Sequence, residues 1–493
     1  MQPPSPSRFE LTLCLSGGGF RATIFHAGTL AALRAMGFLP RVRHIVSVSG
    51  GSIVAAHATL NWARYIDSNE DVFRAAVREL LATTSLDVRG RILRRWLFLG
   101  TLPRYRRVNQ LVRFYDRLYG GTRLEDLAGG GRPKLYIAAT SLVSGRRVYF
   151  SSDGLHYDAL DGTPSINLPE LPLAKAVAAS SAFPPMFPPL VLDPKVLKVN
   201  MHLDRLTDAG VYDNLGILAG SELAADGELL ISDASAAFGS NSWSKYWLTL
   251  GRNVRTTDIL MSRIAELDKK NAGAGVKTNV HVASISDTVS DDQLRQLPAS
   301  IDPAEPLALT PALQKYVAQV RTDLDVFLVP EVQALFRHGY TVAANAFGRL
   351  ATRQSDPGSP ALIAKRWWDP TSADTRFTDS LKPIARARRG LMSHIRATVL
   401  GPQRPEPKTP DQWQAVLEKA GSRRWGIWNR RDPFCWLLLA VLAAIVVYLV
   451  ITTSSTPASM TLSASLSTAS KRMLPTSSLH DQGRRLDEHE VVC

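Results

Sequence analysis

Two stretches near the N-terminus decide the fold: LTLCLSGGGFR at residues 11–21 and HIVSVSGGS at residues 44–52. Each begins as an apolar run typical of a buried strand, breaks into glycines, and continues with the apolar spacing of a helix. Two strand–turn–helix units in succession predict a mainly parallel sheet covered by helices. The first turn of each helix also presents backbone N–H groups, where the helix dipole favours negative charge.

The glycine turn after the first strand has several possible uses. It lacks the Gly-Lys-Ser/Thr ending of a phosphate-binding loop, and Ala22 stands where a dinucleotide-binding fingerprint requires its last glycine. An oxyanion hole needs only glycines that let N–H groups approach a developing negative charge, which Gly17, Gly18 and Gly19 would allow. A simple tight turn is the alternative. Arg21 would be either a cation near a phosphate-bearing substrate or a brace for the loop.

The second turn, SVSGG at residues 47–51, is similar to a G-x-S-x-G nucleophile elbow. Ser47 takes the first glycine position of that pattern, and Gly51 takes the second. An elbow would place Ser49 at a strand-to-helix corner, where its hydroxyl can attack a carbonyl carbon. The alternative is that Ser49 is an ordinary helix N-cap.

A serine nucleophile needs a base, which is commonly a histidine. His338 lies inside a predicted helix, where a histidine is more often structural than catalytic. Asp208 follows a strand-like run and precedes Ala209 and Gly210, a sharp turn that would aim its carboxylate outward. A carboxylate shielded from water can accept the hydroxyl proton directly if its pKa is raised. The alternative role of Asp208 is to cap the turn.

Composition limits the classes of partner. The 493 residues carry a formal net charge of +14, which suits nucleic acid, an anionic membrane or an acidic substrate. No zinc-finger, homeodomain or RNA-recognition signature accompanies that charge, so the sequence favours a membrane over nucleic acid. The cysteines Cys14, Cys435 and Cys493 are scattered, and they predict neither a disulfide framework nor a metal site.

Residues 89–107 mix arginines with tryptophan, phenylalanine, tyrosine and leucine. Such a mixture suits a membrane interface, with guanidinium groups among headgroups and rings at the acyl boundary. The alternative is a solvated arginine face whose apolar residues belong to the core. Nucleic-acid binding by this stretch is less favoured because no docking motif accompanies it.

Residues 434–451 contain no charged side chain and approach the length needed to span a bilayer. Arginines and tryptophans precede the run, whereas a Ser/Thr-rich stretch without basic residues follows it. This asymmetry predicts a single-pass transmembrane helix with the N-terminal part in the cytoplasm. We expect residues 452–493 to be a disordered polar tail on the far side.

Four motifs then occur in a fixed order, at residues 17–21, 49–52, 179–185 and 208–214. On these motifs the chain resembles the patatin-like phospholipases, roughly over residues 9–346. The resemblance implies a three-layer α/β/α sandwich and a Ser–Asp dyad that works without histidine. It also implies hydrolysis of fatty acyl esters of glycerolipids, with no metal or other cofactor.

Carried onto this chain, the resemblance makes Ser49 the nucleophile and Asp208 the base. Gly17, Gly18 and Gly19 would supply the oxyanion hole, and Arg21 would support it. The chain departs from the family pattern at two places, because Ser47 and Ala209 stand where glycine is more usual. The expected organisation is a tail at residues 1–8, a catalytic domain at 9–350 with helices at 313–327 and 330–346, and peripheral helices and a linker at 351–430.

The sequence therefore predicts a membrane-anchored serine lipid acyl hydrolase. Its substrate would be a phospholipid or another acyl lipid, and its partner a membrane surface. Two alternatives stay open: a lipid acyltransferase that uses the same site, and an inactive membrane-tethered lipid-binding protein in which Ser47 and Ala209 have abolished catalysis.

Overall fold

The computed structural model describes residues 10–158, 160, 166–168, 170–184, 186–193, 197, 204–224, 227–235, 249–271, 278–297, 308–350, 409–422 and 432–454. The strands are β1 (Leu11–Leu15), β2 (Val42–Ser47), β3 (Lys134–Ser141), β4 (Arg147–Ser151), β5 (Gly154–Tyr157), β6 (Leu190–Val191), β7 (Arg205–Asp208), β8 (Glu228–Asp233) and β9 (Asn279–Ser284).

The helices before β8 are α1 (Gly19–Ala35), α2 (Gly50–Leu60), α3 (Trp62–Tyr65), α4 (Glu70–Ala82), α5 (Val88–Leu99), α6 (Arg107–Tyr119), α7 (Leu173–Ser180) and α9 (Ile217–Ala224). Those after it are α10 (Thr249–Asn271), α11 (Asp291–Arg295), α12 (Pro311–Ala318), α13 (Val329–Gly348), α17 (Pro410–Ser422) and α18 (Pro433–Ser454). Short 3₁₀ turns include η3 (Pro103–Tyr105) and η6 (Ala209–Val211).

The predicted α/β fold is confirmed, with a mixed sheet at its centre. Its main path runs β5-β4-β3-β2-β1-β8-β9. The five strands from β3 to β9 along this path pair in parallel, as the two strand–turn–helix units predicted. The other edge is antiparallel, because β4 and β5 form a meander on β3 and β7 pairs with the far end of β3. This antiparallel addition brings the end of β7 beside the end of β2.

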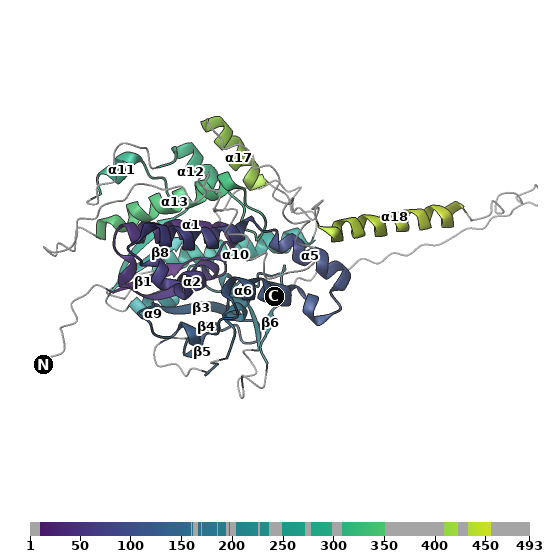
Figure 1. Ribbon diagram of the computed structural model, residues 1–493, viewed down its shortest axis with the longest axis horizontal. Helices are drawn as coiled ribbons and strands as arrows, with labels where there is room; N and C mark the ends of the chain where they lie inside the picture. The colour runs from purple at the N-terminus through teal and green to yellow at the C-terminus, as the bar shows by residue number, and fades with distance from the viewer. Residues whose placement is uncertain are drawn as a thin grey trace, which may run out of the picture. The chain divides into compact units, whose positions relative to one another are not determined.

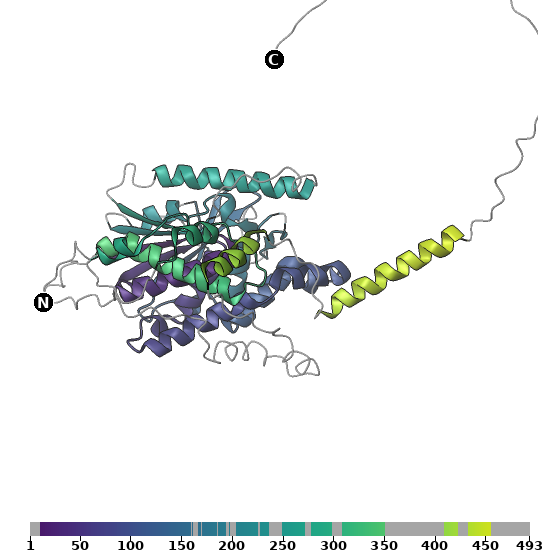
Figure 2. The ribbon, with the colours of Figure 1, turned by 90° about the horizontal axis from the view of Figure 1, so that it is seen from above.

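Helices cover both faces of the sheet (Figures 1 and 2). Leu13 and Leu15 of β1 belong to the larger core, which also contains apolar residues of α1, α2 and α13. Cys14, between them, belongs to a smaller core on the opposite face, with residues of α9. This alternation is the period-two pattern of a strand buried on both faces. Figure 2 shows α10 as the long teal helix at one side of the molecule.

One predicted helix is wrong over its second half. The expected helix at residues 313–327 ends at Ala318, and residues 319–328 form an irregular segment that leads into α13. The backbone carbonyls of Ala318 and Val320 accept hydrogen bonds from the buried Arg21 side chain. The carbonyl of Asp323 accepts the N–H of Phe20. Contacts with distant residues therefore replace the i to i−4 bonds that a continuing helix would form.

The C-terminal apolar run forms α18. Its residues Pro433–Thr452 have a mean hydropathy of 3.0 and are long and apolar enough to cross a membrane. The predicted linker at residues 351–430 lies outside the described residues except at 409–422, and the predicted tail lies outside them beyond residue 454. The N-terminal tail at residues 1–8 also lies outside them.

Candidate active site

Ser49 sits at a strained corner between β2 and α2. Its φ of 49° and ψ of −115° lie outside the usual regions for an L-residue. In the part of the chain that the structure describes, Asp158 is the one other non-glycine residue with positive φ. The next residue, Gly50, begins α2, and a Cβ there would lie 2.0 Å from the carbonyl oxygen of Gly19. The corner can therefore pack on the glycine loop only because residue 50 lacks a side chain. A strained backbone at the serine, as at Ser49, is a feature of nucleophile elbows.

A chain of serine hydroxyls holds this corner. The N–H of Ser49 donates to the Oγ of Ser180, at the end of α7, over 2.9 Å. The Ser180 hydroxyl lies 2.9 Å from the Ser52 hydroxyl, which donates to Ser47 Oγ over 3.1 Å. The buried Ser47 hydroxyl in turn bonds to the carbonyl of Tyr136 on β3. Serine at the first elbow position is thus accommodated by hydrogen bonds. Ser180 lies in the third sequence motif, but that motif did not reveal its bond to Ser49.

Asp208 ends β7 and is almost completely buried, with 1% of its surface exposed. Its N–H donates to the carbonyl of Ala182, and its Oδ1 accepts the N–H of Gly210 over 2.8 Å. Burial raises the pKa of Asp208 to about 7, although hydrogen bonds from the Ser49 hydroxyl and the Gly210 N–H act in the opposite direction. The structure thus brings together the predicted nucleophile and the predicted base. A carboxylate with a pKa near neutrality is suited to accept a proton and return it.

The three glycines of the loop do not offer equivalent N–H groups. The N–H of Gly17 donates to the carbonyl of Asn214, so it is already paired. The N–H groups of Gly18 and Gly19 form no hydrogen bond with the described residues. They lie at the start of α1, where the helix leaves its first N–H groups without partners. A Cβ on Gly17 would lie 3.3 Å from the Cβ of Ser49, so this loop is adjacent to the serine.

Arg21 points into the protein. Its side chain is buried, and its guanidinium donates to the carbonyls of Ala318, Val320 and Ala234, at 3.3, 2.8 and 2.6 Å. Burial lowers the pKa of Arg21 to about 10, and the negative charge of Asp233 partly opposes that effect. Of the two roles considered from the sequence, these contacts are those of a brace. Arg21 holds the glycine loop against the segment that follows α12 and against the end of β8.

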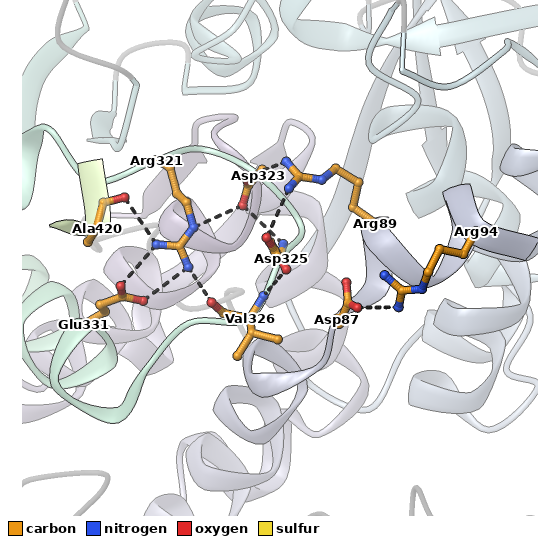
Figure 3. A network of polar contacts seen from close by, with 9 residues as sticks. All are labelled: Asp87, Arg89, Arg94, Arg321, Asp323, Asp325, Val326, Glu331 and Ala420. Carbon is orange, nitrogen blue, oxygen red and sulfur yellow. Dashed lines mark hydrogen bonds and ion pairs between the residues drawn. The ribbon is translucent and has the colours of Figure 1, made fainter. Parts of the chain in front are cut away.

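A network of ion pairs holds the segment after α12 (Figure 3). Arg321 pairs with the fully buried Glu331 of α13, with both contacts at 3.2 Å. Arg89, near the start of α5, pairs with Asp323 at 2.6 Å and with Asp325 at 3.1 Å. Because Asp323 also accepts the Phe20 N–H, the network extends from α5 to the first turn of α1. No motif or periodicity in the sequence predicts this network, because its members come from three separated parts of the chain.

Two of the buried histidines, His26 and His338, bond to groups other than Ser49. His26 bonds through its ring nitrogens to Ser232 Oγ and to the carbonyl of Ser16, and burial lowers its pKa to about 4. His338 bonds to the carbonyl of Ile285, and burial lowers its pKa to about 4 as well. Both are therefore neutral at pH 7 and occupied away from Ser49. Among the described residues, no group of three or more His, Cys, Asp or Glu side chains could hold a metal ion.

The part of the chain that contains this site is similar to a known protein family. Residues 13–220 match the family model described as patatin-like phospholipase. This part of the chain is a patatin-like phospholipase domain. No curated protein sequence matches the chain. The matched range begins within β1 and contains the elbow and the end of β7, so it includes both Ser49 and Asp208.

Solved structures similar to this chain include a human phospholipase and proteins from two bacteria. Human GIVD cytosolic phospholipase A2 is 14% identical, with a TM-score of 0.39, over 70% of this chain and 62% of that one. VipD from Legionella pneumophila is 13% identical, with a TM-score of 0.29, over 69% of this chain and 67% of that one. The ExoU–SpcU complex of Pseudomonas aeruginosa is 15% identical, with a TM-score of 0.22, over 85% of this chain and 76% of that one. The chain spans about three fifths of the length of the human enzyme.

The patatin-like domain is completed by residues beyond the matched range. All three carbonyls that accept from Arg21 belong to residues after position 220, as do Asp323 and Glu331. The glycine loop of the patatin-like domain is thus braced by the C-terminal part of the sheet and by the segment between α12 and α13.

Proposed function

We propose that this protein is a membrane-anchored lipid acyl hydrolase in which Ser49 is the nucleophile and Asp208 the base. The observation that carries the proposal is that the strained Ser49 corner and the buried Asp208 at the end of β7 are brought together beside the glycine loop, and burial raises the pKa of Asp208 to about 7. The patatin-like phospholipase domain supports the lipid as substrate class.

The reaction follows from these groups. Ser49 Oγ attacks the acyl carbonyl carbon while its proton passes to Asp208. The N–H groups of Gly18 and Gly19 stabilise the oxyanion of the tetrahedral intermediate. The bond to the alcohol oxygen then breaks, and the leaving alcohol takes the proton from Asp208. A water molecule attacks the acyl-enzyme, again giving a proton to Asp208, and the fatty acid is released as Ser49 recovers its proton.

The membrane anchor in this proposal is α18. Its composition and length support a single span, and by the positive-inside rule the arginines at 423, 424, 430 and 431 favour a cytoplasmic side for the catalytic domain, residues 9–350. Residues 452–493 would then lie on the opposite side. Protease treatment of sealed vesicles with the catalytic domain outside should remove that domain and leave an epitope at the C-terminus protected.

The catalytic proposal is tested by acyl release from phospholipid vesicles and by labelling with a fluorophosphonate. The wild-type chain should release fatty acid and become labelled, and Ser49→Ala should do neither. Ser152→Ala, which removes a hydroxyl from the turn between β4 and β5, is the matched control and should behave as wild type. Unchanged hydrolysis by Ser49→Ala would exclude this mechanism. Labelling with transfer of the acyl group to an added lipid alcohol would favour the acyltransferase instead.

A further inference from the structure

We propose that the C-terminal end of α5, together with η3, is the surface that lies in the membrane interface during catalysis. In this proposal Arg94 fixes that arrangement by holding the residues that lead into α18. We define the interfacial edge as Trp96, Leu97 and Leu102. The interfacial edge would lie in the headgroup region of an anionic phospholipid bilayer. The proposal rests on the proposed function, but its test does not require catalytic activity.

A buried ion pair connects α5 with the start of the apolar helix. Arg94 is 2% exposed, and its Nε donates to Asp432 over 2.8 Å. The same guanidinium pairs with Asp87 at 2.6 Å, next to the network of Figure 3. The Phe98 and Phe434 rings lie 6.0 Å apart between centroids. Because Asp432 immediately precedes α18, these contacts hold the point at which the candidate span begins against the same helix that carries the interfacial edge.

The interfacial edge is apolar and exposed. Trp96, Leu97 and Leu102 are 41%, 56% and 50% exposed, whereas Ile92, earlier on α5, is buried. The guanidinium of Arg107 lies 4.8 Å from the centre of the Trp96 ring, so a cation covers the tryptophan face. The stretch is thus divided: its first turns pack into the core, and its end presents an exposed tryptophan and leucines among arginines. That combination suits a headgroup layer with negative charge.

The edge also adjoins the site. Arg107 donates to the carbonyl of Met186, in the loop that follows α7 and the Ser49-bonded Ser180. At the other end of α5, Arg89 pairs with Asp323, whose backbone carbonyl accepts the N–H of Phe20, the second residue of α1. Arg89 and Arg107, at the two ends of residues 89–107, therefore contact parts of the chain that adjoin the glycine loop and the elbow.

The test measures depth in the bilayer and does not depend on catalysis. Full-length protein carrying Ser49→Ala and Cys493→Ser is reconstituted in vesicles of phosphatidylcholine and phosphatidylglycerol, and Leu97→Cys is labelled with bimane. The matched control is Leu142→Cys, which is 52% exposed in the turn after β3. Quenching by nitroxide lipids should be at least about threefold stronger at position 97 than at position 142. Equal quenching at the two positions would overturn the proposal.

A second variant tests the role of Arg94. Adding Asp432→Asn to the Leu97→Cys protein removes the charge partner that joins Arg94 to the start of α18, while Asp87 and α18 remain, and quenching at position 97 should fall by about half as the edge leaves the interface. Undiminished quenching would overturn the role of the ion pair. Hydrolysis of a water-soluble ester by Asp432→Asn in the active background reports that the domain is folded. Failure of the proposed function would appear instead as an inactive wild-type chain with the quenching pattern unchanged.

Discussion

Replacing the proposed base with its neutral isostere should make the protein more stable and inactive at the same time. Asp208 is buried, and its pKa is raised from 3.8 to about 7. The folded state therefore holds a proton at pH values where the unfolded chain has already lost it. Between about pH 4 and pH 7 the wild-type protein should lose stability as pH rises, because ionising Asp208 in the fold costs more than ionising it in water. Asp208→Asn has no such proton and should not show this loss.

The magnitude follows from the difference between the two pKa values. A difference of about three, at about 1.4 kcal/mol each, gives a penalty of about 4 kcal/mol for the ionised wild-type side chain above pH 7. The side-chain oxygen of asparagine can still accept the Gly210 N–H. The stability gained by Asp208→Asn should therefore not be offset by an unpaired backbone N–H. The advantage of Asp208→Asn in the free energy of unfolding should therefore grow from about pH 4 and level off above pH 7.

Two assays check this reasoning. Urea unfolding of wild type and Asp208→Asn in the same detergent, at pH values from 4 to 9, gives the difference in stability. In the wild type, the rate of hydrolysis of a water-soluble ester should fall about tenfold per pH unit below pH 7. At pH 7, the rate for Asp208→Asn should be about 10²–10⁴-fold lower than for the wild type. Parallel stability curves for the two proteins, or an active Asp208→Asn, would show that Asp208 is not the buried base described here.

Two further predictions concern the parts that hold the site. Gly50→Ala would place a methyl group 2.0 Å from a backbone oxygen of the glycine loop, so it should abolish activity and destabilise the fold by more than about 3 kcal/mol. Gly145→Ala, at a positive φ with open space, should cost only about 1 kcal/mol by thermal unfolding. Glu331→Gln leaves the buried Arg321 with Asp323, at 3.5 Å, as its remaining charge partner and should cost about 3 kcal/mol, whereas Glu266→Gln in an exposed ion pair should cost less than about 1 kcal/mol. Equal melting temperatures for the two glutamine variants would contradict the structural role of the Arg321 pair.

The strands and turns around Ser49 could be predicted from sequence because their determinants are local. The apolar runs of β1 and β2, the glycines that follow them and the apolar spacing of α1 are all set by residues close together in the chain. The candidate span is equally local, since length and the lack of charge suffice. The same local logic failed for residues 319–328, where Arg21 and Phe20 take the backbone carbonyls that a helix would have used.

The sequence by itself determined the α/β class, the strained serine corner and the apolar helix, and the order of its motifs singled out Asp208. Only the tertiary structure decided which groups meet. Antiparallel pairing of β7 on β3 carries Asp208 to Ser49, Asn214 occupies the N–H of Gly17, and Arg21 turns inward to carbonyls beyond residue 220. Hydrogen-bond partners so far apart in the chain leave no periodicity or spacing to read, because their geometry is set by how the sheet and its covering helices pack.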